Sequence, residues 1–473
     1  MKLQFLAVLP YFQSILADTC AFCRHEELVG DWKVEFSAEG IYSQENRCYS
    51  DTEFEVAGET TFTFYGENNV RHNGYNSEGD FTLIYKEAFE ARVAGRRWWA
   101  WFYYEPESCG TDSPNFDCGK TMTGVTHDLQ AKEWACFRMT KIQNLEKIEE
   151  NKKSERTIKY WNRLSWSEHK SVVDRLGYYQ ITDEEPEMHP SLIGAPKRIR
   201  EEGERLPLDI EGTLRTIEEA KVNVEKNNKN AALQGASILP ENWDWDSLGF
   251  DSPQHPQGSC GSCFTFAAIN MLENRARVQT NNTWQPVFSQ QDPLSCHPEL
   301  SQACDGGFAY HIAGKYANEF GVIDQKCFTY KQALGRDMYP CQPDIEGCQR
   351  YKVSEYEYVA GYYKTTNEYE MRKEIYNHGA ITIGYDSSIT SGYKGGIIVP
   401  VETLGFDPLY IVGHAVTIVG YGVEDGVPFW KVKNSWGVSW GEKGYFRILR
   451  GANVAGVESM PFKATIIPPL PQL

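Results

Sequence analysis

The sequence predicts an α+β protein in which a charged connector separates an all-β N-terminal region from a mixed C-terminal region. Three observations lead to this prediction. Short aromatic and β-branched runs fill residues 18–142, a charged stretch without cysteine covers 143–238, and helical and strand patterns both occur in 239–473. A chain of 473 residues is long enough for two or three domains with sizeable cores.

The N-terminal region has the pattern of an antiparallel barrel or sandwich. Gly, Asn, Ser and Asp separate its apolar runs and favour turns between them. The expected strands are 31–37, 52–58, 60–66, 81–93, 96–104 and 133–142. This region contains no acid, base or metal-ligand constellation, so we expect it to bind or to shield rather than to catalyse.

The connector at 143–238 is expected to be helical and accessible to proteases. It includes the charged run "NLEKIEENKKSERTIKYW" and the polar run "VNVEKNNKNAALQGAS". A plain linker is one interpretation. A length near a hundred residues favours a removable pro-segment.

Charge and the N-terminal residues limit the partners and the compartment. A net charge of −18 repels phosphate backbones, so no nucleic acid partner is expected. Residues 1–17 combine Lys2 with a short apolar run and predict a secretory signal peptide cleaved after Ala17. The alternative is a buried N-terminal strand. No other stretch is long enough to predict a membrane span.

The cysteines of a secreted chain predict a disulfide framework. Six precede residue 140, namely Cys20, Cys23, Cys48, Cys109, Cys118 and Cys136. Seven follow residue 259, namely Cys260, Cys263, Cys296, Cys304, Cys327, Cys341 and Cys348. Because seven is odd, one thiol of the second group is left over, either as a reactive group or for an intermolecular bond.

The stretch "QGSCGSCFTFAA" at 257–268 contains the candidate for this thiol. Its C-x-x-C spacing suits a redox pair, half a zinc site, or a disulfide partner next to a nucleophile. Apolar residues from Cys263 onward recur at helical spacing, which places Cys263 at a helix N-terminus. The helix dipole and the terminal N–H groups stabilise a thiolate there.

A nucleophilic thiol needs a base, and His414 is the strongest candidate among ten histidines. It begins the apolar strand "HAVTIVGYG", which an "EDG" turn joins to the strand "PFWKVKNSWG". A turn at 424–425 or 425–426 places His414 opposite Ser435 or Gly437, within a few residues of Asn434. By contrast, His378 before Gly379 is expected to end a helix.

Gln257 offers a side-chain amide to a developing oxyanion, and the Cys263 N–H is a second donor. Together with "CGSCF" at 260–264, "CDGG" at 304–307, "GHAVTIVGYG" at 413–422 and "KNSWG" at 433–437, it resembles the papain family. That resemblance implies a two-lobed catalytic domain, with a helical lobe and a β-barrel lobe, over 239–473.

The papain resemblance also assigns roles. It makes Cys263 the nucleophile, His414 the base, Asn434 the orienting residue and Gln257 the oxyanion donor. Trp436 would shield the Asn–His hydrogen bond, and Gly306 and Gly307 would bind substrate. It implies the disulfides Cys260–Cys304, Cys296–Cys341 and Cys327–Cys348. Cys263 is then the remaining thiol, and the zinc and redox interpretations of Cys260 no longer apply.

Further motifs resemble the cathepsin C (dipeptidyl peptidase I) family. They are "DTCAFC" at 18–23, "TMTGVTHDLQAKEWACF" at 121–137, "LPENWDWDS" at 239–247, "GKYANEFGVID" at 314–324 and "KGYFRILRGAN" at 443–453. This resemblance identifies 18–142 as an all-β antiparallel barrel, the exclusion domain, which blocks the cleft beyond the second substrate residue. Asp18 would bind the substrate's α-amino group.

The same resemblance implies a zymogen with an activation peptide at 143–238. A heavy chain would begin at Leu239 and run to about 406, and a light chain would begin after a nick at Asp407-Pro408. An activating protease, a homotetramer of processed chains and a lysosomal or secretory-vesicle location, possibly extracellular, are also implied. Asn281 would carry a glycan. A chloride ion, and no metal, would be bound by Phe308, Tyr310 and Tyr358.

In the N-terminal region the resemblance implies the pairs Cys23–Cys118 and Cys48–Cys136. Cys20 and Cys109 have no family counterparts and would pair with each other.

The sequence therefore predicts a cysteine aminodipeptidase that removes dipeptides from the free N-termini of peptides and proteins. One alternative is a papain-like endopeptidase whose N-terminal domain moves aside. Another is a non-catalytic binding protein on a protease fold, against which intact Cys263, His414 and Asn434 argue.

Overall fold

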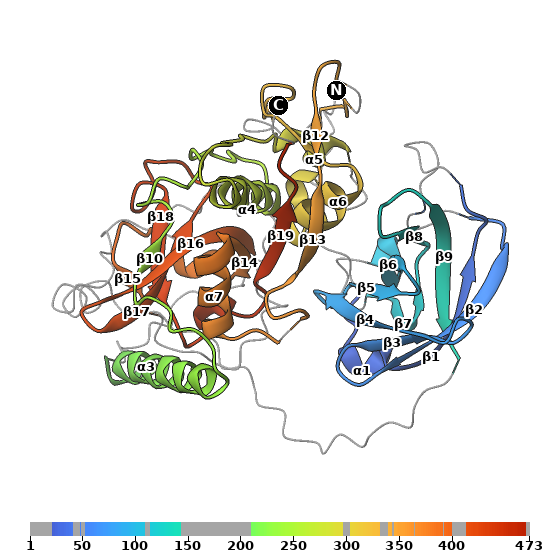
Figure 1. Ribbon diagram of the computed structural model, residues 1–473, viewed down its shortest axis with the longest axis horizontal. Helices are drawn as coiled ribbons and strands as arrows, with labels where there is room; N and C mark the ends of the chain where they lie inside the picture. The colour runs from blue at the N-terminus through green and yellow to red at the C-terminus, as the bar shows by residue number, and fades with distance from the viewer. Residues whose placement is uncertain are drawn as a thin grey trace, which may run out of the picture.

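The computed structural model describes residues 21–40, 48, 53–108, 114–142, 210–296, 303–331, 339–342, 345–363, 365–390, 392–399 and 413–469. Figure 1 shows an N-terminal β-domain, in blue, beside a larger domain of helices and strands. Asp18, Cys20, Cys109, Asp407 and Pro408 lie outside the described residues, as does the expected signal peptide.

The N-terminal domain is an antiparallel barrel. Its strands are β1 (Gly30–Phe36), β2 (Gly58–Tyr65), β3 (Asn69–His72), β4 (Ser77–Ile84), β5 (Ala88–Val93), β6 (Arg96–Tyr104), β7 (Phe116–Thr121), β8 (Gly124–Asp128) and β9 (Trp134–Lys141). The pairings β6–β8, β8–β9 and β1–β9 close a ring of eight strands, and β7 pairs with β6 and β9. The short helix α1 (His25–Leu28) precedes β1.

Two expected barrel strands are wrong. The strand expected at 81–93 is divided by a turn after Ile84 into β4 and β5, which pair with each other. The strand expected at 52–58 does not form. Residues 53–57 form no strand, and β2 begins only at Gly58, which pairs with Phe36 at the end of β1. The acidic residues Glu53 and Glu55 are exposed, and Val56 is 38% exposed. Apolar and polar residues alternate in 53–57, but β1 ends at Phe36, so these residues have no strand with which to pair.

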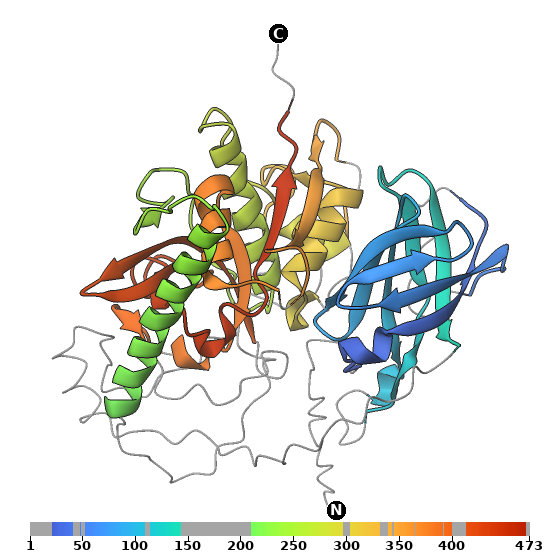
Figure 2. The same ribbon diagram turned by 60° about the horizontal axis from the view of Figure 1, so that its bottom comes forward.

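The larger domain begins with helix α3 (Ile210–Leu233), which belongs to the expected connector. Ile217 and Ala220 of this helix are buried in the same core as the strands and α7. In Figure 2 the helix, in green, lies along the face of the C-terminal sheet. The described part of the connector is therefore helical, as expected, and packs on the larger domain.

The rest of the larger domain has two parts. The helical part contains α4 (Cys263–Gln279), α5 (Gln291–Cys296), η5 (Tyr310–Tyr316) and α6 (Ala317–Glu319) beside the strands β11 (Val322–Ile323) and β12 (Arg350–Tyr351). The second part is an eight-stranded sheet covered by α7 (Glu368–His378). Its strands are β10 (Trp243–Asp244), β13 (Val353–Tyr358), β14 (Ile381–Tyr385), β15 (Ile397–Ile398), β16 (His414–Glu424), β17 (Val427–Lys433), β18 (Tyr445–Leu449) and β19 (Phe462–Ile466).

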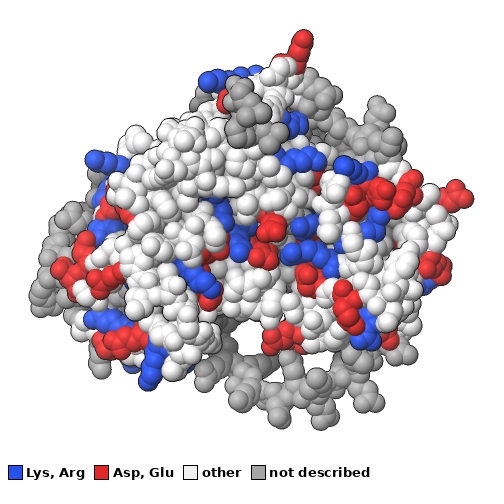
Figure 3. Space-filling model, viewed as in Figure 1, with Lys and Arg blue, Asp and Glu red and all other residues white. Residues whose placement is uncertain are grey.

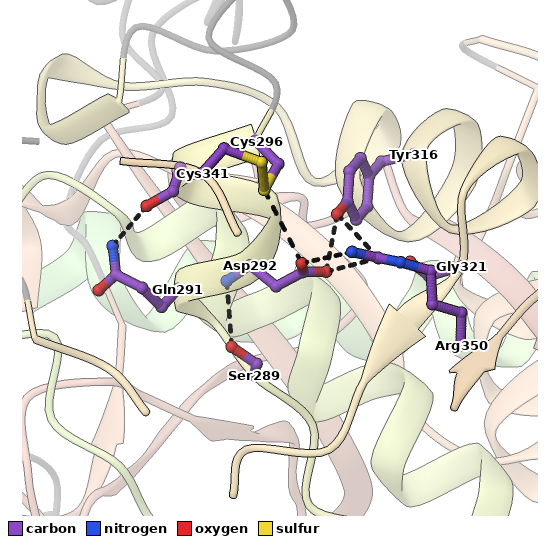
Figure 4. The surroundings of a disulfide bond; sticks show 9 residues. Ser289, Gln291, Asp292, Cys296, Tyr316, Gly321, Cys341 and Arg350 are labelled. Atoms are coloured by element: carbon purple, nitrogen blue, oxygen red, sulfur yellow. Dashed lines mark hydrogen bonds and ion pairs between the residues drawn. A yellow bond between two sulfur atoms is a disulfide. The ribbon is translucent and has the colours of Figure 1, made fainter. Parts of the chain in front are cut away.

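A buried ion pair and a disulfide fix the helical part. The Asp292 carboxylate is fully buried and accepts hydrogen bonds from both terminal nitrogens of Arg350, at 2.9 and 3.0 Å, and from the Tyr316 hydroxyl at 2.7 Å (Figure 4). Cys296 at the end of α5 is bonded to Cys341. These contacts hold α5, η5 and β12 together around α4.

The barrel and the larger domain share buried surface. One apolar core contains α4 and η5 together with Trp99 and Trp101 of the barrel. On the face seen in Figure 3, acidic and basic side chains are interspersed and no broad area carries one sign. No helix of the described residues is long and apolar enough to cross a membrane.

Candidate active site

Cys263 begins helix α4 and is partly exposed. Among the described residues it is the one cysteine outside a disulfide. The bonds formed are Cys23–Cys118, Cys48–Cys136, Cys260–Cys304, Cys296–Cys341 and Cys327–Cys348, which are the pairs implied by the family resemblance. An accessible thiol at a helix N-terminus is in the environment that favours its thiolate form.

His414 lies at the start of β16, and its ring is held by Asn434. The Nε2 atom of His414 is 2.7 Å from Asn434 Oδ1, and both side chains are buried. Asn434 Oδ1 also accepts the backbone N–H of Ser435 at 2.8 Å. The Ala415 N–H points at Cys263 Sγ from 3.5 Å, so the thiol lies beside the residue that follows the histidine.

The hairpin that brings His414 and Asn434 together differs from the expected one by a bulge. Its turn is Asp425-Gly426, one of the two predicted, but the register shifts by one residue between Ile418 and Gly420. The Val419 carbonyl instead accepts the Trp245 N–H at 3.2 Å. Beyond this point Thr417 pairs with Lys433, and the expected alignment of His414 with Ser435 or Gly437 is wrong.

Trp436 covers the histidine. Its ring is stacked on the His414 ring with centroids 4.9 Å apart and an interplanar angle of 27°. Trp440 packs edge-on against Trp436, also at 4.9 Å. The Trp436 side chain is 6% exposed, so these two rings keep water from the hydrogen bond between His414 and Asn434.

The side-chain amide of Gln257 has a fixed orientation. Its Oε1 accepts the Ser435 hydroxyl at 2.5 Å, and its Nε2 donates to the Cys260 carbonyl at 2.8 Å. The Gln257 backbone N–H donates to the Ser435 carbonyl at 2.9 Å. Because an NH₂ group carries two protons, the second N–H remains for an oxyanion beside Cys263. Ser435 was not singled out from the sequence, although it directly follows Asn434.

Gly306 and Gly307 follow Cys304, and the disulfide to Cys260 places them beside the cysteine loop. The Gly261 N–H donates to the Cys304 carbonyl at 2.8 Å. The φ angles of the two glycines are 135° and 157°, which L side chains rarely adopt. The main chain beside this loop therefore has a conformation that favours glycine.

The three residues expected to bind chloride lie together next to these glycines. The rings of Tyr310 and Tyr358 are 5.2 Å apart, and both side chains are buried. The Tyr310 hydroxyl has no hydrogen-bond partner within the described residues, and the Tyr358 hydroxyl lies beside the backbone of Tyr85. Burial raises the pKa of both phenols well above the ordinary value, so both remain donors. Phe308 stacks on Tyr85 of the barrel, with centroids 3.9 Å apart.

Asn281 and His378 lie away from the cysteine. Asn281 is exposed in the turn after α4, where its φ angle is 47°. His378 ends α7, and the N–H of Gly379 caps that helix on the Ile375 carbonyl. Within the described ranges, no group of three or more His, Cys, Asp and Glu side chains could hold a metal ion.

Comparisons with known proteins match the two domains to two known families. Residues 239–465 match the papain family of cysteine proteases, and residues 18–141 match the cathepsin C exclusion domain. Cathepsin C of Schistosoma mansoni is 32% identical over 467 residues, which cover 96% of each chain. The viral cathepsin of Adoxophyes honmai nucleopolyhedrovirus is 32% identical over 47% of this chain and 60% of its own.

Among solved structures, digestive procathepsin L2 proteinase from Tenebrio molitor larval midgut aligns with a TM-score of 0.48 and 24% identity, over 63% of this chain and 88% of that chain. The two family matches lie in the order barrel, then peptidase, and the Schistosoma mansoni relative matches across both. The chain therefore belongs to the cathepsin C family of papain-type cysteine proteases.

Proposed function

We propose that this cysteine protease is an aminodipeptidase, which removes dipeptides from the free N-termini of peptides and proteins. The observation that carries the proposal is the contact between the barrel and the glycine segment beside Cys263. Tyr85, in the turn between β4 and β5, stacks on Phe308 directly after Gly306 and Gly307. A shielding domain in this position can limit how far a substrate extends past the nucleophile.

The path of the N-terminal segment supports Asp18 as the group that binds the substrate amine. The Cys23 N–H donates to the Lys86 carbonyl at 2.8 Å, and Lys86 follows Tyr85 in the same turn. Asp18 precedes Cys23 by five residues, which span at most about 18 Å when extended. A carboxylate on this short tether can pair with an α-ammonium group near the site.

In the proposed reaction, the Cys263 thiolate attacks the carbonyl carbon of the second substrate residue. The resulting oxyanion accepts hydrogen bonds from Gln257 Nε2 and the Cys263 N–H. His414, oriented by Asn434, protonates the leaving amine as the C–N bond breaks and a thioester remains. His414 then takes a proton from water, which attacks the thioester and releases the dipeptide.

A chloride ion fits the residues between the barrel and η5. The two buried hydroxyls of Tyr310 and Tyr358 can both donate to an anion, and such donors are costly to leave without a partner. Bound chloride would supply an acceptor for these phenols and so fix the wall of the substrate site. It takes no part in the bond-making steps.

Processing and location follow the same family pattern in this proposal. The chain is made with a signal peptide, cleaved at the ends of 143–238 and near Asp407, and assembled as a homotetramer in the lysosome or in secretory vesicles. Asn281 is exposed and can accept a glycan.

The test compares two fluorogenic dipeptidyl amides, one with a free α-amine and one N-acetylated, on the processed protein at mildly acidic pH with reductant and chloride. Cleavage of the free-amine substrate alone supports the aminodipeptidase. Equal cleavage of both supports the endopeptidase alternative. An Asp18→Asn variant provides the control, because it should lose activity on the free-amine substrate while Cys263 is still alkylated at the normal rate.

A further inference from the structure

The hydroxyl of Tyr330 connects the two segments that carry the proposed oxyanion donors. It donates to the Gln257 carbonyl at 2.8 Å and lies 2.8 Å from Ser262 Oγ. Gln257 supplies the side-chain donor, and Ser262 directly precedes Cys263, whose N–H is the backbone donor. Tyr330 lies outside the papain-family and cathepsin C-family motifs of the sequence.

The direction of these hydrogen bonds follows from counting protons. A carbonyl oxygen only accepts, so the single phenol proton of Tyr330 goes to Gln257. The Ser262 hydroxyl must then donate to the Tyr330 oxygen. Burial raises the pKa of Tyr330, so the phenol is protonated at neutral and acidic pH. The result is a directed chain of hydrogen bonds from Ser262 through Tyr330 to Gln257.

The ring of Tyr330 is itself held in place. It packs edge-on against Phe266 of α4, with centroids 4.9 Å apart. The backbone N–H of the next residue, Lys331, donates to Gln291 Oε1 at 2.9 Å. Gln257 and Ser262 are both fully buried, whereas Tyr330 is half-buried.

From this geometry we propose that Tyr330 is a positioning residue that sets the spacing of the two oxyanion donors. It touches neither the substrate nor the thiol in this role. Its hydroxyl keeps the Gln257 main chain and the Ser262–Cys263 peptide at a fixed separation, so that both N–H groups converge on one oxygen. The inference rests on the proposed cysteine-peptidase mechanism.

The test uses Tyr330→Phe in the processed full chain, which removes the hydroxyl and keeps the ring against Phe266. Loss of one oxyanion donor costs about 10²–10³ in kcat, and a donor that is misplaced rather than lost should cost about tenfold. We therefore expect kcat to fall about tenfold with KM within twofold of wild type.

Two reagents separate this role from a general structural one. A peptide aldehyde forms a hemithioacetal whose oxygen occupies the oxyanion position, so its affinity should fall by the same factor as kcat. Alkylation of Cys263 by iodoacetamide forms no oxyanion, so its rate should stay within twofold. The proposal would be overturned if the aldehyde affinity and the alkylation rate fell by similar factors. It would also be overturned if the aldehyde affinity did not change.

Two further variants complete the design. Tyr393→Phe removes a comparable hydroxyl, which donates to the Gly396 carbonyl at 2.7 Å, and should leave kcat and aldehyde affinity unchanged. Ser262→Ala combined with Tyr330→Phe should lose no more than Tyr330→Phe alone, because both act through one chain of hydrogen bonds. If the losses in kcat from the two substitutions were additive, Ser262 and Tyr330 would not act through the same hydrogen bonds.

Failure of the proposed function would look different. In that case the wild-type chain would cleave both fluorogenic amides equally, or neither of them, while the aldehyde and alkylation measurements on Cys263 would still report on Tyr330.

Discussion

Tyr356 of β13 donates its hydroxyl to Glu90 of the barrel at 2.7 Å, across the boundary between the two domains. Glu90 also accepts Arg97 Nη1 at 2.6 Å, and the Arg97 guanidinium carbon lies 4.3 Å from the centre of the Tyr356 ring. All three side chains are buried. The domains are therefore joined by the contacts of Tyr356 with a buried charge pair of the barrel, as well as by apolar contacts.

Removing the acid of this cluster should weaken the docking of the barrel. Glu90→Ala leaves the Arg97 charge buried without its carboxylate, and such a change costs about 3–5 kcal/mol. We expect denaturant unfolding of the variant to separate into two transitions, with the barrel released first. Glu59→Ala removes an exposed carboxylate of the same barrel, 2.8 Å from Lys33, and should shift the midpoint little. A single unshifted transition for Glu90→Ala would contradict this account.

Glu273 should contribute more stability in acid than at neutral pH. This α4 side chain is fully buried, and burial raises its pKa to about 7 from the ordinary glutamate value of 4.5, against the opposing effect of Lys433. The folded protein then holds the proton more tightly than the unfolded chain. The contribution of Glu273 to stability is therefore greatest below about pH 4.5 and falls by about 3 kcal/mol as the pH rises to about 7.

The check is to compare wild type with Glu273→Gln in denaturant unfolding at pH 4.5, 6 and 7.5. The amide cannot ionise, so the variant should lack this part of the pH dependence and gain relative stability at pH 7.5. If the free energy of unfolding changed with pH in the same way for both proteins, Glu273 would have the same protonation state in the folded and unfolded chains from pH 4.5 to 7.5.

Tyr310→Phe should weaken the proposed chloride site without unfolding the protein. The substitution removes a buried hydroxyl that has no partner within the described residues, so the apolar packing is kept. A hydrogen bond to an ion contributes about 1.5–3 kcal/mol, so the chloride concentration for half-maximal activity should rise at least about tenfold. Titration of activity with chloride at constant ionic strength measures this shift, and Tyr393→Phe is the control. An unchanged chloride dependence would argue against these phenols as ligands.

Gly451→Ala should loosen helix α3. The φ angle of Gly451 is 98°, and a Cβ there would lie 2.8 Å from the Ala220 carbonyl of α3. Gly426→Ala has comparable backbone strain, with a φ angle of 76°, but nothing within 4 Å of the new Cβ. Both variants should lose about 1–2 kcal/mol from strain, and only Gly451→Ala should expose α3 to limited proteolysis. Equal protease resistance would mean that the helix tolerates the added methyl group.

Local patterns in the sequence predicted much of the site. The helix that begins at Cys263 and the Asp425-Gly426 turn both follow from residues close together in the chain. The bulge at Val419 could not be predicted in this way, because its carbonyl bonds to Trp245, far away in sequence. Tyr330 was missed for the same reason, since its hydroxyl contacts residues 68 and 73 positions away.

The barrel was predicted as a class, but not strand by strand. Aromatic runs identified β1, β6 and β9, whereas β3 and β8 are short and contain few such residues. Residues 53–57 were predicted as a strand but form none, because an alternating pattern does not form a strand without a neighbouring strand to pair with. Pairing partners are decided by the closure of the whole ring.

The turn at Tyr85 and Lys86 also has a consequence for how specificity can evolve. In the proposed enzyme, the number of residues released is set by the tether held at this turn, whereas the side chains accepted are set by the peptidase domain. The length of the product and its side chains are then determined by two different parts of the chain, the N-terminal tether and the peptidase domain. Substitutions around Tyr310 could retune which dipeptides are favoured while every product remained a dipeptide.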